Sequence, residues 1–246
     1  QACGEVGDGR MLEPEDIVER LIGFFQPKLL RGHRVLLTAG PTFEPIDPVR
    51  GITNLSSGKM GFALARAASQ AGAEVTLVAG PCHQDTPAGV LRIDVQTAQQ
   101  MHDAVMRELD TSKNDIFIAV AAVADWRVAQ AADQKLKKQN DSDVPTLAFT
   151  QNPDILAAVA RRANAPFCVG FAAETERLEE FGEAKRQKKG IPLLVGNLGH
   201  QTFGRDDNEV ALFDAKGITR LPRADKLTLA RQIVAAIADR IPGTRP

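Results

Sequence analysis

Residues 115–122 limit the possible folds more than any other part of the sequence. After Asp115 they read IFIAVAA, a continuous apolar run of the kind found in a central parallel strand that is buried on both faces. Shorter apolar strand patterns recur along the chain, at 33–37, 74–78, 90–95, 167–171 and 192–195. The sequence therefore predicts a large, mostly parallel sheet.

Helical patterns lie between these strands. Apolar residues recur at helical spacing from about 57 to 68, 97 to 109, 154 to 163, 175 to 189 and 224 to 239. Strands that alternate with helices over short connections predict the α/β class, with a doubly wound, Rossmann-like sheet. Segments 209–214 and 218–221 flank Ala215-Lys216-Gly217 and predict a C-terminal hairpin before the last helix. A further helix is expected within 13–30, ahead of the first strand.

In such folds ligands bind beyond the carboxyl ends of the strands. This rule selects four segments as the functional edge: 40–61, 79–87, 121–138 and 171–175. The first contains Gly40 and then SSGKMG at 56–61, where a helix is expected to begin. Free N–H groups at a helix start suit phosphate oxygens. The alternative is an ordinary capped helix after a long loop.

The side chains of this loop fit a phosphate site. Ser56 and Ser57 are candidate helix caps, Gly58 and Gly61 let a ligand approach the backbone, and Lys59 adds a mobile cation.

Two stricter phosphate-binding patterns are missing. A P-loop needs four residues between its glycines and a Ser or Thr after the lysine, whereas Met60 follows Lys59. A dinucleotide fingerprint requires an acid after the second strand, and here Val78 leads into Ala79-Gly80-Pro81. The sequence therefore gives less support to an NAD(P)-dependent oxidoreductase with this fold.

The loop after the central strand carries further polar groups. Asp125 can accept hydrogen bonds from a ribose or a base, and Lys135 belongs to a lysine-rich run that ends at Lys138. The run can neutralise a triphosphate, although a solvated basic loop is the alternative. Asn54 is either a turn former or a donor to a reacting acyl-phosphate. Lys185 and Lys189 share one face of a charged helix, where surface lysines are also common.

Composition excludes several classes of function. The 246 residues carry 30 Lys and Arg against 31 Asp and Glu, so no nucleic-acid or membrane partner is indicated. Cys3, Cys82 and Cys168 are widely spaced and the histidines lack metal-ligand spacing, so no disulfide scaffold and no zinc or other protein-ligated metal site is expected. The chain shows no signal-peptide pattern, and we expect a cytoplasmic protein.

Six motifs occur in one order: TAGPTFEPIDPVR, N-L-SSGKMG, AAVADWR, K-L-KK, NPDIL and VGFAAET. Together they resemble the phosphopantothenoylcysteine synthetase domain of bacterial bifunctional coenzyme A biosynthesis proteins, from about His33 to the C-terminus. The opening ACGEVGDGRM resembles the last active-site loop of the fused flavin-dependent decarboxylase, in which Cys3 matches the proton-donating cysteine. The resemblance divides the chain into 1–32, a decarboxylase-derived loop and linker helix, and 33–246, the ligase domain. FMN would belong only to the absent decarboxylase body, so we expect no decarboxylation.

The resemblance implies a two-step ligase reaction in coenzyme A biosynthesis. CTP, with Mg²⁺, activates the carboxylate of 4'-phosphopantothenate as an acyl-cytidylate and releases pyrophosphate; the amine of cysteine then displaces CMP. By matching position, Asn54 acts around the acyl-cytidylate and Lys135, in a flap, assists its formation. The implied CTP contacts are Ala119, Val120, Ala121, Asp125, Lys135, Pro153, Asp154, Ile155, Leu156, Phe171, Lys185 and Lys189.

The resemblance also implies a homodimer, and a larger oligomer in the fused protein. Trp126 stands where the family is expected to have tyrosine or another aromatic residue. From the residues alone, a non-catalytic nucleotide-binding module and an NAD(P)-dependent oxidoreductase remain as alternatives.

Overall fold

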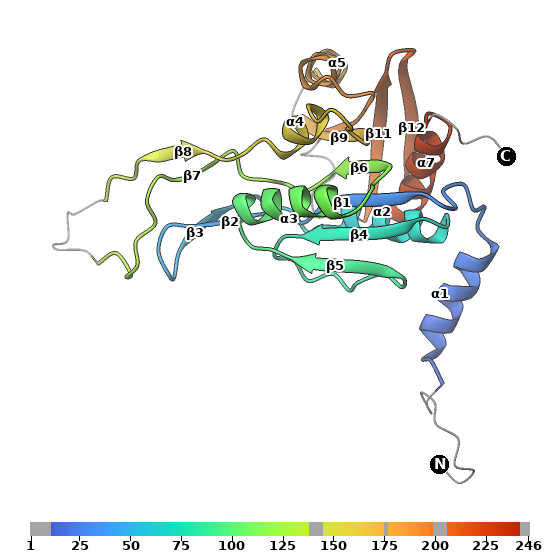
Figure 1. Ribbon diagram of the computed structural model, residues 1–246, viewed down its shortest axis with the longest axis horizontal. Helices are drawn as coiled ribbons and strands as arrows, with labels where there is room; N and C mark the ends of the chain where they lie inside the picture. Colours follow the sequence, from blue (N-terminus) through green and yellow to red (C-terminus); the bar gives the residue numbers. More distant parts are fainter. Residues whose placement is uncertain (1–10, 138–144, 175–176, 199–205, 242–246) are drawn as a thin grey trace, which may run out of the picture.

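The computed structural model describes residues 11–137, 145–174, 177–198 and 206–241. Its main sheet has the strand order β12-β11-β10-β9-β6-β1-β4-β5, and Figure 1 labels each of these strands except β10. All neighbouring pairs from β5 to β10 are parallel, and β11 and β12 extend the sheet as an antiparallel hairpin. The six parallel strands have the Rossmann order, which reverses between β1 and β6. The predicted α/β, doubly wound fold with its C-terminal hairpin and helix is confirmed.

The bounds of the main-sheet strands are β1 Arg34–Ala39, β4 Glu74–Ala79, β5 Val90–Asp94, β6 Ile116–Ala119, β9 Phe167–Glu174, β10 Leu193–Leu198, β11 Asp207–Asp214 and β12 Gly217–Asp225. The helices are α1 Pro14–Phe25, α2 Lys59–Gln70, α3 Ala98–Thr111, α4 Ile155–Ala160, α5 Leu178–Lys189 and α7 Lys226–Ala238.

Alternating side chains of the strands enter two separate cores. Val35 and Leu37 of β1 pack with α2 and α7 on one face, whereas Leu36 packs with α3 and α4 on the other. In β6, Ile116 and Ile118 join the first core and Phe117 joins the second. The sheet is therefore the middle of three layers, and its central strands are mainly apolar because both faces are covered.

Two short ribbons project from the carboxyl-end edge of the sheet (Figure 1). One pairs β2 Phe43–Pro45 with β3 Gly51–Thr53, and the other pairs β7 Trp126–Val128 with β8 Phe149–Gln151. Glu44 anchors the first ribbon: it is buried, and its Oε1 accepts a hydrogen bond of 2.8 Å from the backbone nitrogen of Ala98 at the start of α3. The sequence analysis predicts neither ribbon.

Several predicted boundaries are wrong. The central strand ends at Ala119 rather than Ala122, because Ala121 N donates to the Thr38 side chain instead of continuing the ladder. α4 ends at Ala160 rather than at 163, and α5 begins at Leu178 with residues 175 and 176 outside the described part. The last helix begins at Lys226 because Asp225 caps it by accepting a hydrogen bond from Thr228 N.

The predicted N-terminal helix is confirmed as α1, which ends at Phe25. None of its residues is buried, and Val18, Leu21, Ile22, Phe24 and Phe25 are exposed. The helix is attached to α2 by an ion pair of 2.7 Å between Glu19 Oε1 and Arg66 Nε. No helix in the described part of the chain is long and apolar enough to cross a membrane.

Candidate functional site

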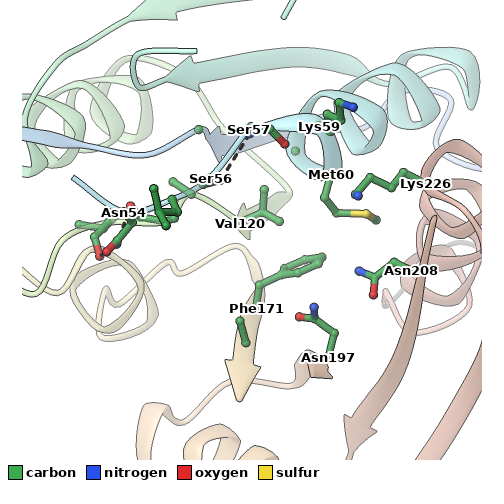
Figure 2. Close-up of a pocket in the computed structure, with 18 of the residues that line it drawn as sticks. Asn54, Ser56, Ser57, Lys59, Met60, Val120, Phe171, Asn197, Asn208 and Lys226 are labelled. Carbon is green, nitrogen blue, oxygen red and sulfur yellow. Dashed lines mark hydrogen bonds between the residues drawn. The ribbon is translucent and has the colours of Figure 1, made fainter. Parts of the chain in front are cut away.

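A cavity of about 390 Å³ opens where the strand order reverses. Residues at or just past the carboxyl ends of four parallel strands line it: Gly40 after β1, Val120 to Val123 after β6, Phe171 to Ala173 in β9 and Asn197 in β10. Residues 54–61, which are the loop before α2 and the first residues of that helix, form another wall, and Lys226 at the start of α7 also lines the cavity. Figure 2 shows these side chains around the cavity. A switch-point crevice of this kind is the usual ligand site of a doubly wound sheet.

The start of α2 offers backbone N–H groups to the cavity. Its N-cap is Gly58, in the left-handed conformation with φ 75°, and no side chain caps the helix. The N–H groups of the first turn have no partner inside a helix, so they are available to an anion. The prediction that Ser56 or Ser57 caps the helix is wrong. Ser56 Oγ instead accepts a long 3.4 Å hydrogen bond from Gly58 N.

Close packing fixes this helix start against the sheet. A Cβ atom on Gly61 would lie 2.4 Å from Ala39 Cβ and 2.7 Å from Val120 Cγ1, which is too close for any side chain. A Cβ on Gly58 would lie 3.1 Å from Cys82 Sγ. The glycines therefore bring the helix start to the strand ends.

Asn54 bridges the loop before α2 to the loop after β6. Its Nδ2 donates to the carbonyl oxygens of Ala122 at 3.0 Å and Val123 at 3.1 Å. These two carbonyls accept both amide hydrogens, so the carboxamide oxygen is the group left for a ligand. The residue thus shapes the loop and lines the cavity, while both hydrogens that the predicted donation to an acyl-phosphate needs already bind these carbonyl oxygens.

The opposite end of the cavity is cationic. Lys59 Nζ forms an ion pair of 2.5 Å with Asp206 Oδ1, and Lys226 lies nearby at the start of α7, as Figure 2 shows. Burial lowers the pKa of the Lys226 ammonium below its ordinary value, and the charge of Lys59 lowers it further. The hydrogen bond from Lys59 lowers the pKa of Asp206.

A second polar group gathers at the start of α4. Asp154 caps the helix, accepting a hydrogen bond of 3.0 Å from Ala157 N, and forms an ion pair with Lys189 of α5. Burial opposes ionisation of Asp154, but the hydrogen bonds from Lys189 and Ala157 N, together with the charges of Lys189 and Arg161, outweigh it and lower the pKa. Asn152 ties this turn to the loop after β6, because its backbone nitrogen donates to Asp125 O at 2.9 Å.

The Lys135 segment is tied to the turn between β2 and β3. Asp47 Oδ2 accepts a hydrogen bond of 3.1 Å from Leu136 N, and Arg50 Nη2 donates to Leu136 O at 2.9 Å. Lys135 itself is exposed. Lys138, the end of the predicted lysine run, lies outside the described residues, as does Cys3.

The structure brings one part of the predicted site together and leaves the other part outside the cavity. The cavity contains Gly40, Asn54, Ser56, Ser57, Gly58, Lys59, Gly61, Val120, Ala121 and Phe171. The predicted residues that do not line it are Ala119, Asp125, Lys135, Pro153, Asp154, Ile155, Leu156, Lys185 and Lys189. The sequence analysis missed Asn197, Asn208 and Lys226, which also line the cavity. Asn197 follows a predicted strand, so the strand-end rule signals it, whereas Lys226 has no local signal.

The end of β4, where a dinucleotide enzyme holds the ribose acid, is covered by the chain itself. A Cβ on Gly80 would lie 1.8 Å from Pro41 O, so the backbone after β1 lies directly against this strand end. This packing agrees with the absence of an acidic residue in Ala79-Gly80-Pro81.

Residues 30–241 match the family model of the DNA/pantothenate metabolism flavoprotein C-terminal domain. The chain belongs to this family. One relative of the chain is the coenzyme A biosynthesis bifunctional protein CoaBC of Vibrio cholerae. The two are 51% identical, and the match covers 98% of this chain and 61% of the relative. The CoaBC protein of Escherichia coli is 45% identical over 98% of the chain and 60% of its own length. The chain thus spans about three fifths of these curated relatives.

Solved structures of the family agree with the fold. The crystal structure of the C-terminal domain of a CoaBC protein has a TM-score of 0.73 and 35% identity, and the match covers 86% of this chain and 97% of that domain. A Cab2 H337A mutant in complex with phosphopantothenate-cysteine has a TM-score of 0.71, with 92% of each chain covered, but is only 18% identical. The second likeness shows the fold alone. The resemblance noted from the six sequence motifs is confirmed.

Proposed function

We propose that this chain is a phosphopantothenate–cysteine ligase that uses CTP and acts in coenzyme A biosynthesis. The observation that carries the proposal is the switch-point cavity of a CoaBC-type C-terminal domain, in which an uncapped helix start, Asn54 and two lysines meet. Cations and free N–H groups suit two anionic substrates, and a partly enclosed cavity shields a reactive intermediate from water.

The reaction has two steps. In the first, a carboxylate oxygen of 4'-phosphopantothenate attacks the α-phosphorus of CTP, the bond to the β-phosphate breaks, and pyrophosphate leaves. In the second, the amine of cysteine attacks the acyl carbon, the bond to the cytidylate oxygen breaks, and CMP leaves as the nitrogen loses a proton. Lys135 offsets charge in the first step, from the segment that Asp47 and Arg50 hold through Leu136.

Asn54 acts in the second step as a hydrogen-bond acceptor in this proposal. Since the carbonyls of Ala122 and Val123 take both hydrogens of its amide, the oxygen is suited to the N–H groups of the incoming amine. The α4 start, with Pro153, Asp154, Ile155 and Leu156, forms the nucleotide side together with Ala119, Val120, Ala121, Asp125, Phe171, Lys185 and Lys189. The loop of Gly40, Ser56, Ser57, Gly58, Lys59 and Gly61 binds phosphate.

Mg²⁺ fits this chemistry as a companion of the nucleotide. Within the described residues, no three His, Cys, Asp or Glu side chains gather into a metal cluster. Mg²⁺ commonly keeps several waters and binds mainly through substrate phosphates, and it would neutralise the triphosphate there. The protein's own contribution is cationic and comes from its lysines.

The remaining assignments belong to the same proposal. Residues 33–246 form the ligase domain, and 1–32 are a decarboxylase-derived loop and linker helix, in which Cys3 corresponds to the proton-donating cysteine of a decarboxylase that uses FMN. The domain functions as a homodimer in the cytoplasm and as part of a larger oligomer in the fused protein.

Pyrophosphate release tests the proposed function. The chain is supplied with 4'-phosphopantothenate, Mg²⁺ and CTP, with and without cysteine, and with ATP replacing CTP in parallel. We expect sustained release that requires cysteine and prefers CTP. A single burst without cysteine would show that the acyl-cytidylate forms and stays bound. No release from the folded protein would contradict the ligase and favour a nucleotide-binding module.

A further inference from the structure

The loop after β6, residues 120–125, is held from two sides. Its N–H groups bind the segment that follows β1: Ala122 N donates to Gly40 O at 2.9 Å, and Ala124 N donates to the Thr42 hydroxyl at 3.0 Å. Thr42 is buried, so this side of the loop is fixed to the core of the protein. The carbonyl oxygens of the same loop bind other partners.

Two asparagines hold the carbonyl oxygens of four successive residues, 122–125. Asn54 Nδ2 donates to the first two, at 3.0 and 3.1 Å. Asn152 donates to the next two, since its Nδ2 binds Ala124 O at 2.8 Å and its backbone nitrogen binds Asp125 O at 2.9 Å. Asn54 lies before α2 and Asn152 lies before α4. The loop therefore connects the starts of two helices that are far apart in the sequence.

Arg127 fixes the direction in which the Asn152 amide points. Its Nη1 donates to Asn152 Oδ1 at 3.0 Å and to Gln151 O at 2.8 Å. A guanidinium group can only donate and a backbone carbonyl can only accept, so the amide oxygen faces Arg127 and the amide nitrogen faces Ala124. Asn152 does not line the cavity, and the protein engages both ends of its amide. It is therefore suited to holding other groups in place rather than to touching a substrate.

We propose that Asn152 is a positioning residue for Asn54. It acts through the loop: by holding Ala124 O and Asp125 O, it fixes the two preceding carbonyls, to which the Asn54 amide is bound. This inference rests on the proposed function and deepens it, because there Asn54 acts in the cysteine-dependent step and the start of α4 forms the nucleotide side. Side chains that share one hydrogen-bonded segment are energetically coupled. Loss of the Asn152 side chain should thus misplace an intact Asn54.

Single-turnover kinetics test this role. The acyl-cytidylate is formed without cysteine, and its conversion is followed after cysteine is added. In Asn152→Ala we expect this conversion to slow by about tenfold, because small displacements of catalytic groups cost at least that much, whereas KM for CTP should change by less than about twofold. Gln151→Ala, the exposed neighbour in β8, is the control, because it keeps the backbone carbonyl that binds Arg127. A change confined to KM for CTP would overturn the proposal and make Asn152 a support of the nucleotide side.

Double variants separate positioning from general support of the fold. If Asn152 acts through Asn54, then Asn152→Ala should slow the cysteine-dependent step by less than about twofold when Asn54→Ala is already present, since coupled residues are not additive. In a Lys135→Gln background the loss should remain at about tenfold. Equal losses in the two backgrounds would overturn the proposal. Asn152→Asp keeps the shape and the Arg127 contact but cannot donate to Ala124 O, so it provides the same test if Asn152→Ala does not fold.

Nuclear magnetic resonance of the full chain, without substrates, keeps the test independent of turnover. The side-chain amide signal of Asn54 is identified by its loss in Asn54→Ala. In Asn152→Ala this signal should shift and its protons should exchange with water at least about tenfold faster than in wild type, and Gln151→Ala should leave it unchanged. If the signal responds in this way but wild type releases no pyrophosphate, the positioning role stands and the ligase proposal fails. An unchanged signal in the folded variant would overturn the positioning role whatever the activity.

Discussion

Asp47 and Leu136 are joined by a hydrogen bond of 3.1 Å across 89 residues of sequence. The Asp47 side chain is fully buried, and its carboxylate also accepts hydrogen bonds from Val49 N, Arg50 N and the Arg50 guanidinium. The Arg50 hydrogen bond holds the pKa of Asp47 far below its usual range. This carboxylate is therefore ionised at neutral pH and fixes the segment next to Lys135.

Asp47→Asn should loosen the Lys135 segment without removing Lys135. The amide keeps one acceptor oxygen but loses the charge that holds Arg50, so Leu136 N is left without a stable partner. We expect the pyrophosphate-releasing step to slow by about tenfold or more, since misplaced catalytic groups cost that much. Single-turnover pyrophosphate release measures it, with Lys135→Gln as the comparison.

Amide exchange provides the control for this prediction. Exchange of the Leu136 amide should be faster in Asp47→Asn than in wild type, whereas Asp16→Asn, at an exposed helix position, should change neither exchange nor rate. Unchanged exchange at Leu136 together with a slowed reaction would mean that Asp47 acts by some other route.

Asn54→Asp should be more damaging than Asn54→Ala. The aspartate would place a negative oxygen where Nδ2 now donates to Ala122 O and Val123 O, so two attractive contacts become repulsive. Both variants lose the loop contact, and we expect a loss of about 100-fold or more in kcat/KM for Asn54→Asp, comparable to removal of a key polar group in an active site. Steady-state kinetics measure it. Equal kinetics in the two variants would contradict this prediction, because they would show that repulsion between the aspartate and the two carbonyls adds nothing to the loss of the amide contacts.

Gly61→Ala should destabilise the fold, although alanine favours helices. Its Cβ would lie 2.4 Å from Ala39 Cβ, and such overpacking costs about 1 to 3 kcal/mol. For a protein of this size that corresponds to a decrease of roughly 2 to 12 °C in Tm. Gly23→Ala in α1 is the matched control, since its Cβ would meet Gln70 Cγ at an ordinary 3.4 Å and helix propensity favours it by about 1 kcal/mol. Thermal melting should show a lower Tm for Gly61→Ala and a higher Tm for Gly23→Ala than for wild type.

The fold was predictable because parallel strands that are buried on both faces appear in the sequence as apolar runs. In the helices between them, apolar residues recur at helical spacing. The ribbons were not predictable, because β2, β3, β7 and β8 have three residues each and Phe43-Glu44-Pro45 contains a proline. Their pairing depends on tertiary contacts such as that of Glu44 with Ala98 N, which leave no periodic pattern.

The candidate site also contains both residues that could be predicted from the sequence and residues that could not. Gly40, Asn54 and Val120 follow strands or precede a helix, so the strand-end rule locates them. Lys226 begins a helix that follows an antiparallel hairpin, and the strand-end rule does not apply there. It reaches the cavity only because α7 packs against α2, and such packing cannot be seen in either helix alone.

Because of Cys168, the free energy of unfolding should decrease as the pH rises above 9. Cys168 lies in β9 at 2% exposure, and burial raises the pKa of its thiol from 9.0 to about 12. A group whose pKa is higher in the folded protein stabilises the fold fully at pH values below its pKa in the unfolded chain. This stabilisation is lost as the pH rises toward its pKa in the folded protein. The window is therefore about pH 9 to 12, and the slope approaches about 1.4 kcal/mol per pH unit within it.

Denaturant unfolding of wild type and Cys168→Ala at pH 8, 9 and 10 measures this contribution. Both proteins share every other titrating group, including Cys82, so the difference between their unfolding free energies isolates Cys168. At pH 8 the variant should be less stable because it leaves a cavity, and the gap should narrow as pH rises above 9, since only wild type must bury a thiol that is ionised when unfolded. A gap that stays constant from pH 8 to 10 would mean that the thiol ionises as readily in the folded protein as in the unfolded chain.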